Sequence, residues 1–187
     1  MESKIIHFFN YLEYENLDEL GMEFEFPVKS GPNPHMYAKL SNPIYFYLPK
    51  SNVSEIETNE YGENILNYEI DLDEHIDILQ FFDNLDTLCI NKTIINSNKW
   101  FKKKIDQNKL INSYTNIYYN DELNERIAAK FYISDKNCVK IKDYNKNSSL
   151  NLLSKIDSLE FIRNRFKLKL EIVEIVEGLD TIDNLDD

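Results

Sequence analysis

The segment Arg165–Val176 most tightly constrains what this chain can fold into. Apolar and charged residues alternate along it, and a period of two predicts a strand with one buried and one solvent-facing side. The buried side is formed by Phe166, Leu168, Leu170 and Ile172. Such a strand needs neighbouring strands and a core beneath it, and a chain of 187 residues with 42% hydrophobic residues can supply both.

Three earlier segments predict further strands. In 21–28, aromatic and Met side chains alternate with glutamates. The run 44–48 is compact and aromatic, and 64–72 follows a turn that contains a glycine. All five prolines lie between Pro27 and Pro49, which predicts loops and edge strands there.

Three segments are harder to assign. Residues 126–134 and 137–142 resemble the two strands of a hairpin, with its turn at 134–137. Residues 150–162 are ambiguous, and a helix is one interpretation of them. The first stretch, 4–14, mixes apolar and aromatic residues and is compatible with a strand or a short helix.

One long helix is expected at about 73–97. Asp71 or Asp73 can cap its start, and the pair Asn96-Ser97 is expected to end it. A second, short helix is expected over 106–112. The apolar residues of the long helix recur at spacings of three and four, which predicts one buried stripe: Ile76, Leu79, Phe82, Leu85 and Leu88.

Together these segments predict an α+β fold, mostly antiparallel β with one long inserted helix. No internal repeat and no linker divides the chain, so residues 1–177 are expected to form a single domain. After Gly178 the sequence LDTIDNLDD is short and charged, so 178–187 is expected to be a flexible acidic tail.

Charge is distributed in blocks along the chain. Residues 1–90 carry a net charge of −14, residues 91–170 carry +9 and residues 171–187 carry −7, within a total of −12. The total argues against a generic basic nucleic-acid binder, whereas the middle block allows a locally basic surface. Charge can also vary along a chain without functional meaning, because folding then mixes the blocks in three dimensions. This alternative explains the same blocks equally well.

The chain has no recognisable catalytic motif, so a protein that is not an enzyme, with no cofactor and no metal, is expected. There is no Gly-rich phosphate loop, no nucleophile elbow and no HExxH. His7, His35 and His75 never stand at metal-ligand spacing. The acidic run 71–74 has the chemistry to bind a divalent ion, but a helix N-terminus explains it without one.

The same sequence predicts an intracellular protein with no membrane partner. Cys89 and Cys138 have apolar neighbours and no CxxC partner, so both are expected in the core. The first residues lack the apolar core of a signal peptide, and no apolar run has the length of a membrane span.

The segment 96–104 (NSNKWFKKK) sets the sole Trp beside a Phe among four lysines. Proteins that bind single strands use this combination, because cations neutralise phosphates while aromatic faces stack on bases. Further basic and aromatic residues follow on the expected hairpin and on the last strand. The candidate nucleic-acid-binding residues are Lys99, Trp100, Phe101, Lys102, Lys103, Lys104, Tyr114, Tyr118, Lys130, Lys140, Lys142, Arg163, Arg165, Lys167 and Lys169.

These residues also have a purely structural interpretation. Trp100 and Phe101 would close the core behind the helix, and for Trp100 core packing is favoured over base stacking. The basic side of the last strand is more suggestive, because Arg165, Lys167 and Lys169 project from one face. A solvated face needs no such uniformity of sign.

The acidic tail likewise has two interpretations. It keeps the protein soluble, or it occupies the basic surface when nucleic acid is absent and docks replication proteins by charge. Its candidate partner-binding residues are Asp180, Asp183, Asp186 and Asp187.

The stretch 79–104 (LQFFDNLDTLCINKTIINSNKWFKKK) carries a resemblance to a known family. It resembles the helix-and-tryptophan segment of a small protein family of nucleocytoplasmic large DNA viruses. Residues 43–49 and 129–131 are similar to the family's proline-ended strand and to part of its later strand pair, as is Tyr114 to its tyrosines. The segment 156–165 is shorter than its counterpart. The matches in the helix segment are Phe82, Leu85, Asp86, Asn96, Ser97, Trp100, Phe101, Lys103 and Lys104.

This family is thought to be related to viral single-stranded-DNA-binding proteins with an OB-type barrel. The resemblance therefore implies an OB-like barrel with the helix 73–97 inserted. It also implies sequence-independent binding of single-stranded DNA in viral replication, recombination or repair, at the replication site in the host cell or in the virion. RNA as the ligand and a homo-oligomer as the assembly stay open.

Two other classes of protein fit the same charge blocks. One is a structural or scaffolding virion protein, whose acidic first half and basic second half mediate assembly through protein contacts. The other is an acidic regulator that binds a basic protein through residues 1–90 and the tail.

Overall fold

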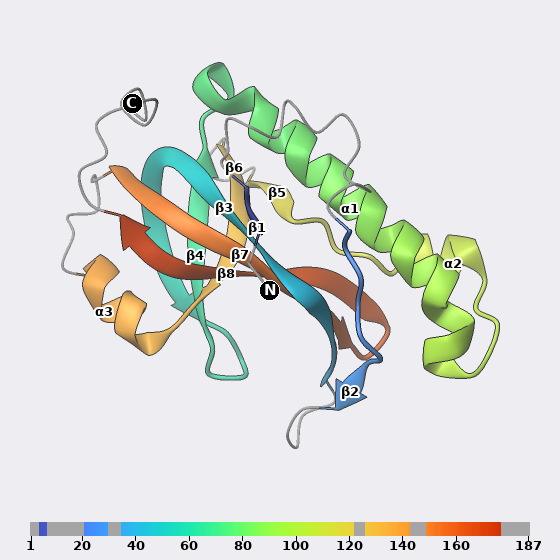
Figure 1. Cartoon of the computed structure of the whole chain (residues 1–187). Coiled ribbons are helices and arrows are strands. Elements are labelled where there is room, and N and C mark those ends of the chain that lie inside the picture. Colours follow the sequence, from blue (N-terminus) through green and yellow to red (C-terminus); the bar gives the residue numbers. More distant parts are fainter. Residues whose placement is uncertain (1–3, 7–20, 30–34, 122–125, 143–148, 177–187) are drawn as a thin grey trace.

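The computed structural model describes residues 4–6, 21–29, 35–121, 126–142 and 149–176, drawn in colour in Figure 1. The helices in this part of the chain are α1 (Leu72–Phe101), α2 (Gln107–Ile111) and α3 (Asp135–Lys142). The strands are β1 (Lys4–Ile6), β2 (Val28–Lys29), β3 (His35–Thr58), β4 (Asn64–Ile70), β5 (Tyr118–Asp121), β6 (Arg126–Ile133), β7 (Ser149–Ile162) and β8 (Arg165–Val176).

All these strands belong to one sheet. Its main path is β1-β3-β4-β6-β8-β7, with β2 paired to β3 and β5 paired to β6. Among the described strands the pairs β1–β3 and β6–β8 are parallel and the others antiparallel. Besides β1 and β2, strand β3 pairs with two long strands, through residues 53–58 with β4 and through residues 35–52 with β7. The predicted mixture of mostly antiparallel strands and one long helix is confirmed, while the OB-like barrel stays a prediction.

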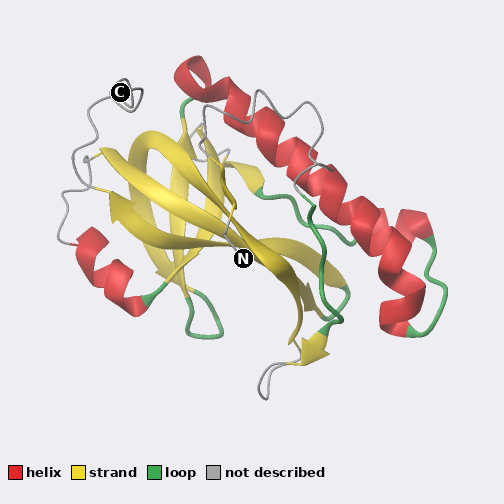
Figure 2. Ribbon diagram, viewed as in Figure 1, coloured by secondary structure: helices red, strands yellow, loops and turns green. Residues whose placement is uncertain are grey.

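The apolar side of the sheet packs against α1. The alternation that predicted β8 is confirmed, because its four apolar residues from Phe166 to Ile172 are all buried. Ring centroids lie 5.3 Å apart between Phe46 and Phe81, and 6.3 Å apart between Phe82 and Phe131, so α1 is joined to both β3 and β6. Figure 2 shows α1 along one side of the curved sheet, α2 beside its last turns, and α3 at the other end.

Both cysteines are core residues, as predicted. Cys89 on α1 and Cys138 on α3 are buried and free. Burial raises the pKa of the Cys89 thiol, which keeps it protonated and unreactive.

The start of α1 is close to its prediction. Asp71 accepts a hydrogen bond from the backbone N–H of Asp73 at 2.9 Å, which is the expected cap. Ile76 is the exception in the predicted stripe, because it is 65% exposed and the buried side of the helix begins at Ile78.

The end of α1 lies beyond its prediction. Asn96 and Ser97 were expected to end the helix, but their side chains bond to the helix itself. The Asn96 amide donates to the backbone oxygen of Lys92 at 2.8 Å, and the Ser97 hydroxyl donates to that of Ile94 at 2.9 Å. The helix therefore continues to Phe101.

The second strand of the predicted hairpin is wrong. Residues 126–133 form β6, but residues 135–142 form helix α3. The backbone N–H of Cys138 donates to the oxygen of Ser134 at 2.8 Å, and Cys138 and Ile141 are buried at helical spacing. The spacing of three between these two buried residues favours a helix here, although the segment is rich in polar residues.

The helical interpretation of residues 150–162 is also wrong, because they belong to β7. The pairing with β8 shifts register between Ile156 and Ser158. This irregularity changes which side chains face the core, so that Ile156 and Leu159 are both buried. Their spacing of three imitates a helix in the sequence.

Residues 21–28 form less strand than predicted. Phe24 makes an isolated bridge to Leu40, and the regular strand β2 is limited to Val28–Lys29. Met22 is buried, whereas Phe26 is 47% exposed. The predicted acidic tail, 178–187, lies outside the described residues.

Candidate nucleic-acid interface

A groove of about 540 Å³ lies between the end of α1, helix α2 and the turn that joins β7 to β8. Three phenylalanines from these elements line it: Phe101, Phe161 and Phe166. Its lining cations are Lys103, Lys104, Lys109, Arg163 and Arg165, beside one described carboxylate, that of Asp106. We call this site the basic groove. It brings together two basic runs that are sixty residues apart in the sequence.

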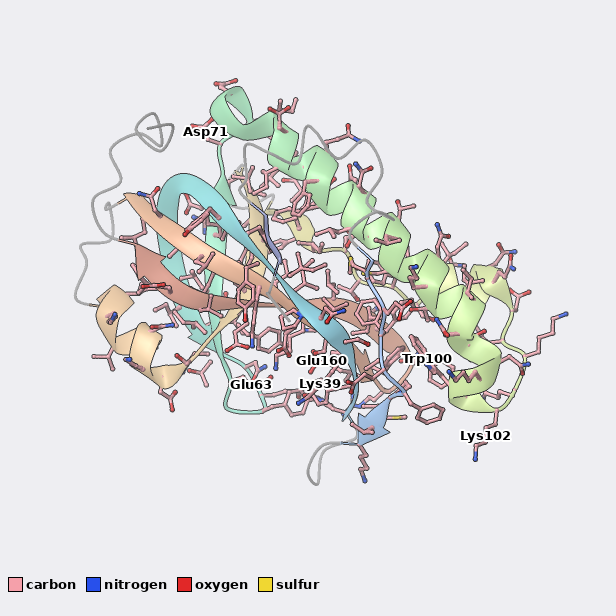
Figure 3. All side chains as sticks on the ribbon, viewed as in Figure 1. Lys39, Glu63, Asp71, Trp100, Lys102 and Glu160 are labelled. Carbon is pink, nitrogen blue, oxygen red and sulfur yellow. The ribbon has the colours of Figure 1, made fainter. Side chains whose placement is uncertain are left out.

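The local fold explains how the lysines reach the groove. Lys102 follows α1 with a φ of 52°, a left-handed conformation that turns the chain out of the helix. Lys102 itself points away from the body of the protein in Figure 3, whereas Lys103 and Lys104 line the groove. Asp106 then caps α2 by accepting a hydrogen bond from the backbone N–H of Lys109 at 3.1 Å.

The β7–β8 turn supplies the arginines. Arg163 has a φ of 55°, in a two-residue turn where glycine or asparagine is the usual residue. Among the described residues, Lys102 and Arg163 are the non-glycine residues with positive φ, and both are cations at the basic groove or beside it. Backbone strain of this kind tends to occur at functional sites.

The groove cations are available to a ligand. All five of their side chains are exposed, and none of them forms an ion pair with another described residue. Their charges therefore project into solvent at one end of the sheet, which is the arrangement that attracts a polyanion.

Trp100 is a core residue, as its structural interpretation proposed, and the base-stacking role predicted for it has no support. It is 4% exposed, with its ring centroid 5.9 Å from that of Phe161. In Figure 3 it lies on the side of α1 that faces the sheet. Its neighbour Phe101 is half-buried and lines the groove, and base stacking by Phe101 stays a prediction.

The predicted tyrosines bond to α1. Tyr114 donates to Asp86 at 2.6 Å and Tyr118 donates to Asp83 at 2.9 Å. Burial raises the pKa of the Asp86 carboxyl to about 6, against the opposing hydrogen bonds from Tyr114 and from the backbone N–H of Ile117. These contacts make both tyrosines structural residues, and neither is among the residues that line the groove.

The basic row of β8 projects from one face as predicted, but carboxylates neutralise most of it. Arg165 lines the basic groove, whereas Lys167 lies 3.3 Å from Glu160 and Lys169 lies 3.0 Å from Glu63. We call Lys167, Lys169, Glu160 and Glu63 together the paired row. Figure 3 shows Glu63 and Glu160 at the same end of the sheet.

The paired row is fully buried at Glu160 and partly buried at its other three residues. Glu160 is 0% exposed, and Tyr132 donates a hydrogen bond to it at 2.8 Å. The Lys169 ammonium lies 3.9 Å above the Tyr132 ring. Burial is the main cause that raises the pKa of Tyr132, and the charge of the Glu160 carboxylate is the second. Burial would raise the pKa of Glu63, but hydrogen bonds, including that from Lys169, lower it overall.

The remaining predicted residues lie elsewhere. Lys99 is exposed on α1, and Lys130 on β6 pairs with Glu57 at 3.6 Å. Lys140 is exposed on α3, at the other end of the sheet in Figure 2. The side chain of Lys142 and the four tail aspartates lie outside what the structure describes.

The sequence did not identify two groove residues. Lys109 stands outside any basic run, and only the cap at Asp106 signals the helix that positions it. Phe161 lies in the segment whose alternation is interrupted by the register shift of β7.

In the described part of the chain, no three His, Cys, Asp and Glu side chains cluster as metal ligands. None of its helices combines the length and apolarity that a membrane span requires.

Fold and surface together define a small α+β protein whose clearest site is a basic, aromatic groove. Within that class the chain belongs to the DUF5871 family, a family of unknown function, whose model matches residues 60–185. The matched stretch contains all the cations and phenylalanines of the basic groove. No curated protein and no solved structure matches the chain.

Proposed function

We propose that this protein binds single-stranded nucleic acid, DNA in the first place, in the basic groove and with broad sequence tolerance. The observation that carries the proposal is the gathering in one groove of five exposed cations, which form no ion pair among the described residues, around the half-buried rings of Phe101 and Phe161. Cations track the phosphates of a single strand while aromatic rings stack on its bases, at about 1–3 kcal/mol per base.

The size of the groove supports a single strand over a duplex. A cavity of about 540 Å³ holds a drug-sized molecule, and an unpaired nucleotide is of that order. The net charge of −12 does not oppose local binding, because salt at about 0.1 M screens charges beyond roughly 10 Å.

An OB-like barrel is part of the same proposal. The pairing order supports it, since it runs from β3 through β4, β6, β8 and β7 back to β3, with β6–β8 as its parallel pair. In the partly open OB barrel, ligands contact the second and third barrel strands and the loops that follow the first and fourth barrel strands. The β7–β8 turn, which supplies Arg163 and lines the groove, corresponds to the later of those loops.

Two further parts of the proposal depend on the sequence alone. A role in viral replication, recombination or repair rests on the resemblance described above. The acidic tail would compete for the groove and dock replication proteins through its charge.

The test is binding of a labelled oligo-dT at low salt, followed by fluorescence anisotropy. The double variant Lys104→Gln, Arg165→Gln should bind at least tenfold more weakly. It should also lower the slope of log affinity against log salt by about 1.4, or about 0.7 per lost phosphate contact. The matched control, Lys136→Gln, Lys140→Gln on α3, should change neither quantity.

Absence of binding at low salt, both for the full chain and after removal of residues 178–187, would overturn the proposal. Light scattering on the same samples adds a positive alternative. Discrete assemblies without nucleic acid, together with absent oligonucleotide binding, would favour the scaffolding role.

A further inference from the structure

A row of directly paired residues crosses the end of the sheet that carries the basic groove. Phe166 on β8 pairs with Phe161 on β7, and Phe161 pairs with Met36 on β3. The last member of the row, Lys29 on β2, pairs with Met36. Residues that lie directly opposite each other in antiparallel strands have their side chains on one face of the sheet. The first three members line the groove, so Lys29 lies on the groove face as well.

Exposure to solvent increases along this row toward β2. Phe166 is buried, Phe161 and Met36 are half-buried, and Lys29 is exposed. Figure 1 shows β2 at the same end of the sheet as the turn between β7 and β8. Lys29 forms no ion pair with another described residue, so its charge is available to a ligand at the outer edge of the groove face.

We propose that a single strand bound in the basic groove continues across Met36 to β2, where Lys29 binds a further phosphate. Neighbouring strands of a sheet lie about 4.8 Å apart, so three spacings place the backbone of Lys29 roughly 14 Å from that of Phe166. The thioether of Met36 lies between them and is apolar and adaptable, which suits contact with a base or a sugar. This inference rests on the proposed function and adds to it a contact outside the groove.

A lysine on an edge strand has a second common role, because its charge keeps the open edge from pairing with another chain. Among the described strands β2 pairs with β3 alone, so this role applies to Lys29 too. The position of Lys29 favours binding, because protection of an edge needs a charge on either face of the strand. Lys29 lies on the one face that carries the groove.

Lys39 on β3 provides the matched control. It is exposed, and it stands three positions after Met36, so its side chain is on the opposite face of the strand. Figure 3 shows Lys39 close to Glu63 and Glu160, which belong to the paired row. Replacing either lysine removes one positive charge from the same end of the sheet, and the two replacements differ in the face from which they remove it.

The experiment measures binding of a labelled oligo-dT of roughly 12 nucleotides to the full chain, by fluorescence anisotropy over a range of salt concentrations. Lys29→Gln should weaken binding several-fold at low salt. It should also lower the slope of log affinity against log salt by about 0.7, as one lost phosphate contact predicts. Lys29→Arg should bind like the wild type, and Lys39→Gln should change neither the affinity nor the slope.

An unchanged affinity and slope in Lys29→Gln, beside a loss in the double variant Lys104→Gln, Arg165→Gln, would overturn the contact at β2 and leave the groove proposal intact. Equal losses in Lys29→Gln and Lys39→Gln would also overturn it, because they would depend on net charge and not on position. Association of Lys29→Gln in light scattering, with unchanged binding, would assign Lys29 to protection of the edge instead. Absence of binding by the wild type would remove the proposed function itself, and this contact with it.

Discussion

The basic groove and the paired row are neighbours on β8, yet they use cations in opposite ways. Arg165 begins the strand and is exposed in the groove. Lys167 and Lys169 follow at the next positions on the same face, where each meets a glutamate from another part of the sheet. A run of like charges in the sequence therefore overstates the surface that a polyanion can reach.

Burial explains the difference. Glu160 is completely buried, and a buried carboxylate without a cation is strongly destabilising, so Lys167 stabilises the fold. Among the described residues that line the groove there is no buried carboxylate. The free energy of hydration of the groove cations is therefore the main term that a ligand must replace. Substitutions in the paired row should lower stability, whereas those in the groove should lower affinity.

The largest effect should come from Trp100, where the aromatic wall of the groove meets the core. Trp100→Ala should lower the free energy of unfolding by about 4 kcal/mol, because it removes a buried ring packed on Phe161. Urea unfolding followed by circular dichroism measures this, since the variant lacks the chain's one Trp.

Its matched control is Phe101→Leu, at the next position. That variant should lose little stability and bind oligo-dT more weakly, because Phe101 lines the groove. If Trp100→Ala kept its stability and lost binding instead, Trp100 would be the stacking residue and the distinction between core and groove would fail.

A smaller effect on stability is expected from Lys167→Met, which keeps most of the side-chain stem. Roughly 2–3 kcal/mol should be lost because Glu160 is left without its cation, a value reduced from that of a fully buried pair because Lys167 is 33% exposed. Arg165→Met should leave the melting temperature unchanged and weaken oligonucleotide binding.

Equal losses of stability in these two variants would show that the paired row and the groove are not energetically distinct. Loss of binding by a fully stable Lys167→Met would place Lys167 in the interface. Thermal unfolding and anisotropy on the same preparations distinguish these results.

Periodicity predicted the parts of the fold in which one pattern runs without interruption. Strand β8 and most of α1 have a regular apolar spacing, and both were located from it. Strand β7 was missed because its register shift breaks the alternation, which depends on how it pairs with β8. Helix α3 was missed because two buried residues, Cys138 and Ile141, carry its pattern.

The sequence predicted which types of residue form the candidate site, and the structure corrected which positions do so. The run Lys103-Lys104 and the arginines of the β7–β8 turn are adjacent only in three dimensions, and they do line one groove. Trp100 has the chemistry of a stacking residue, but local sequence carries no information about whether Phe161 covers it. Ion pairing of Lys167 and Lys169 depends on strand neighbours for the same reason.

The smallest predicted effect concerns Asp86, whose contacts help to support the basic groove. Its carboxylate holds Tyr114 and Ile117. The segment between them bonds to β8, because the backbone N–H of Thr115 donates to the oxygen of Phe166 at 2.9 Å. Burial raises the pKa of Asp86 from 3.8 to about 6. Its stabilising contribution is therefore complete below the unfolded value of 3.8 and is lost as the pH rises through about 6.

The wild type should lose roughly 1–2 kcal/mol of stability relative to Asp86→Asn between pH 4 and pH 7, since the amide cannot titrate. Glu63 in the paired row provides a control of opposite sign. Its pKa is lowered, so its contribution is present above its ordinary value and is lost as the pH falls. Urea unfolding of the wild type against Asp86→Asn between pH 4 and pH 7, and against Glu63→Gln below pH 4.5, should give two opposite slopes. Burial dominates at Asp86, whereas bonds to Asn59 and Lys169 dominate at Glu63. Slopes of the same sign would mean that the two regions do not differ in how they hold charge.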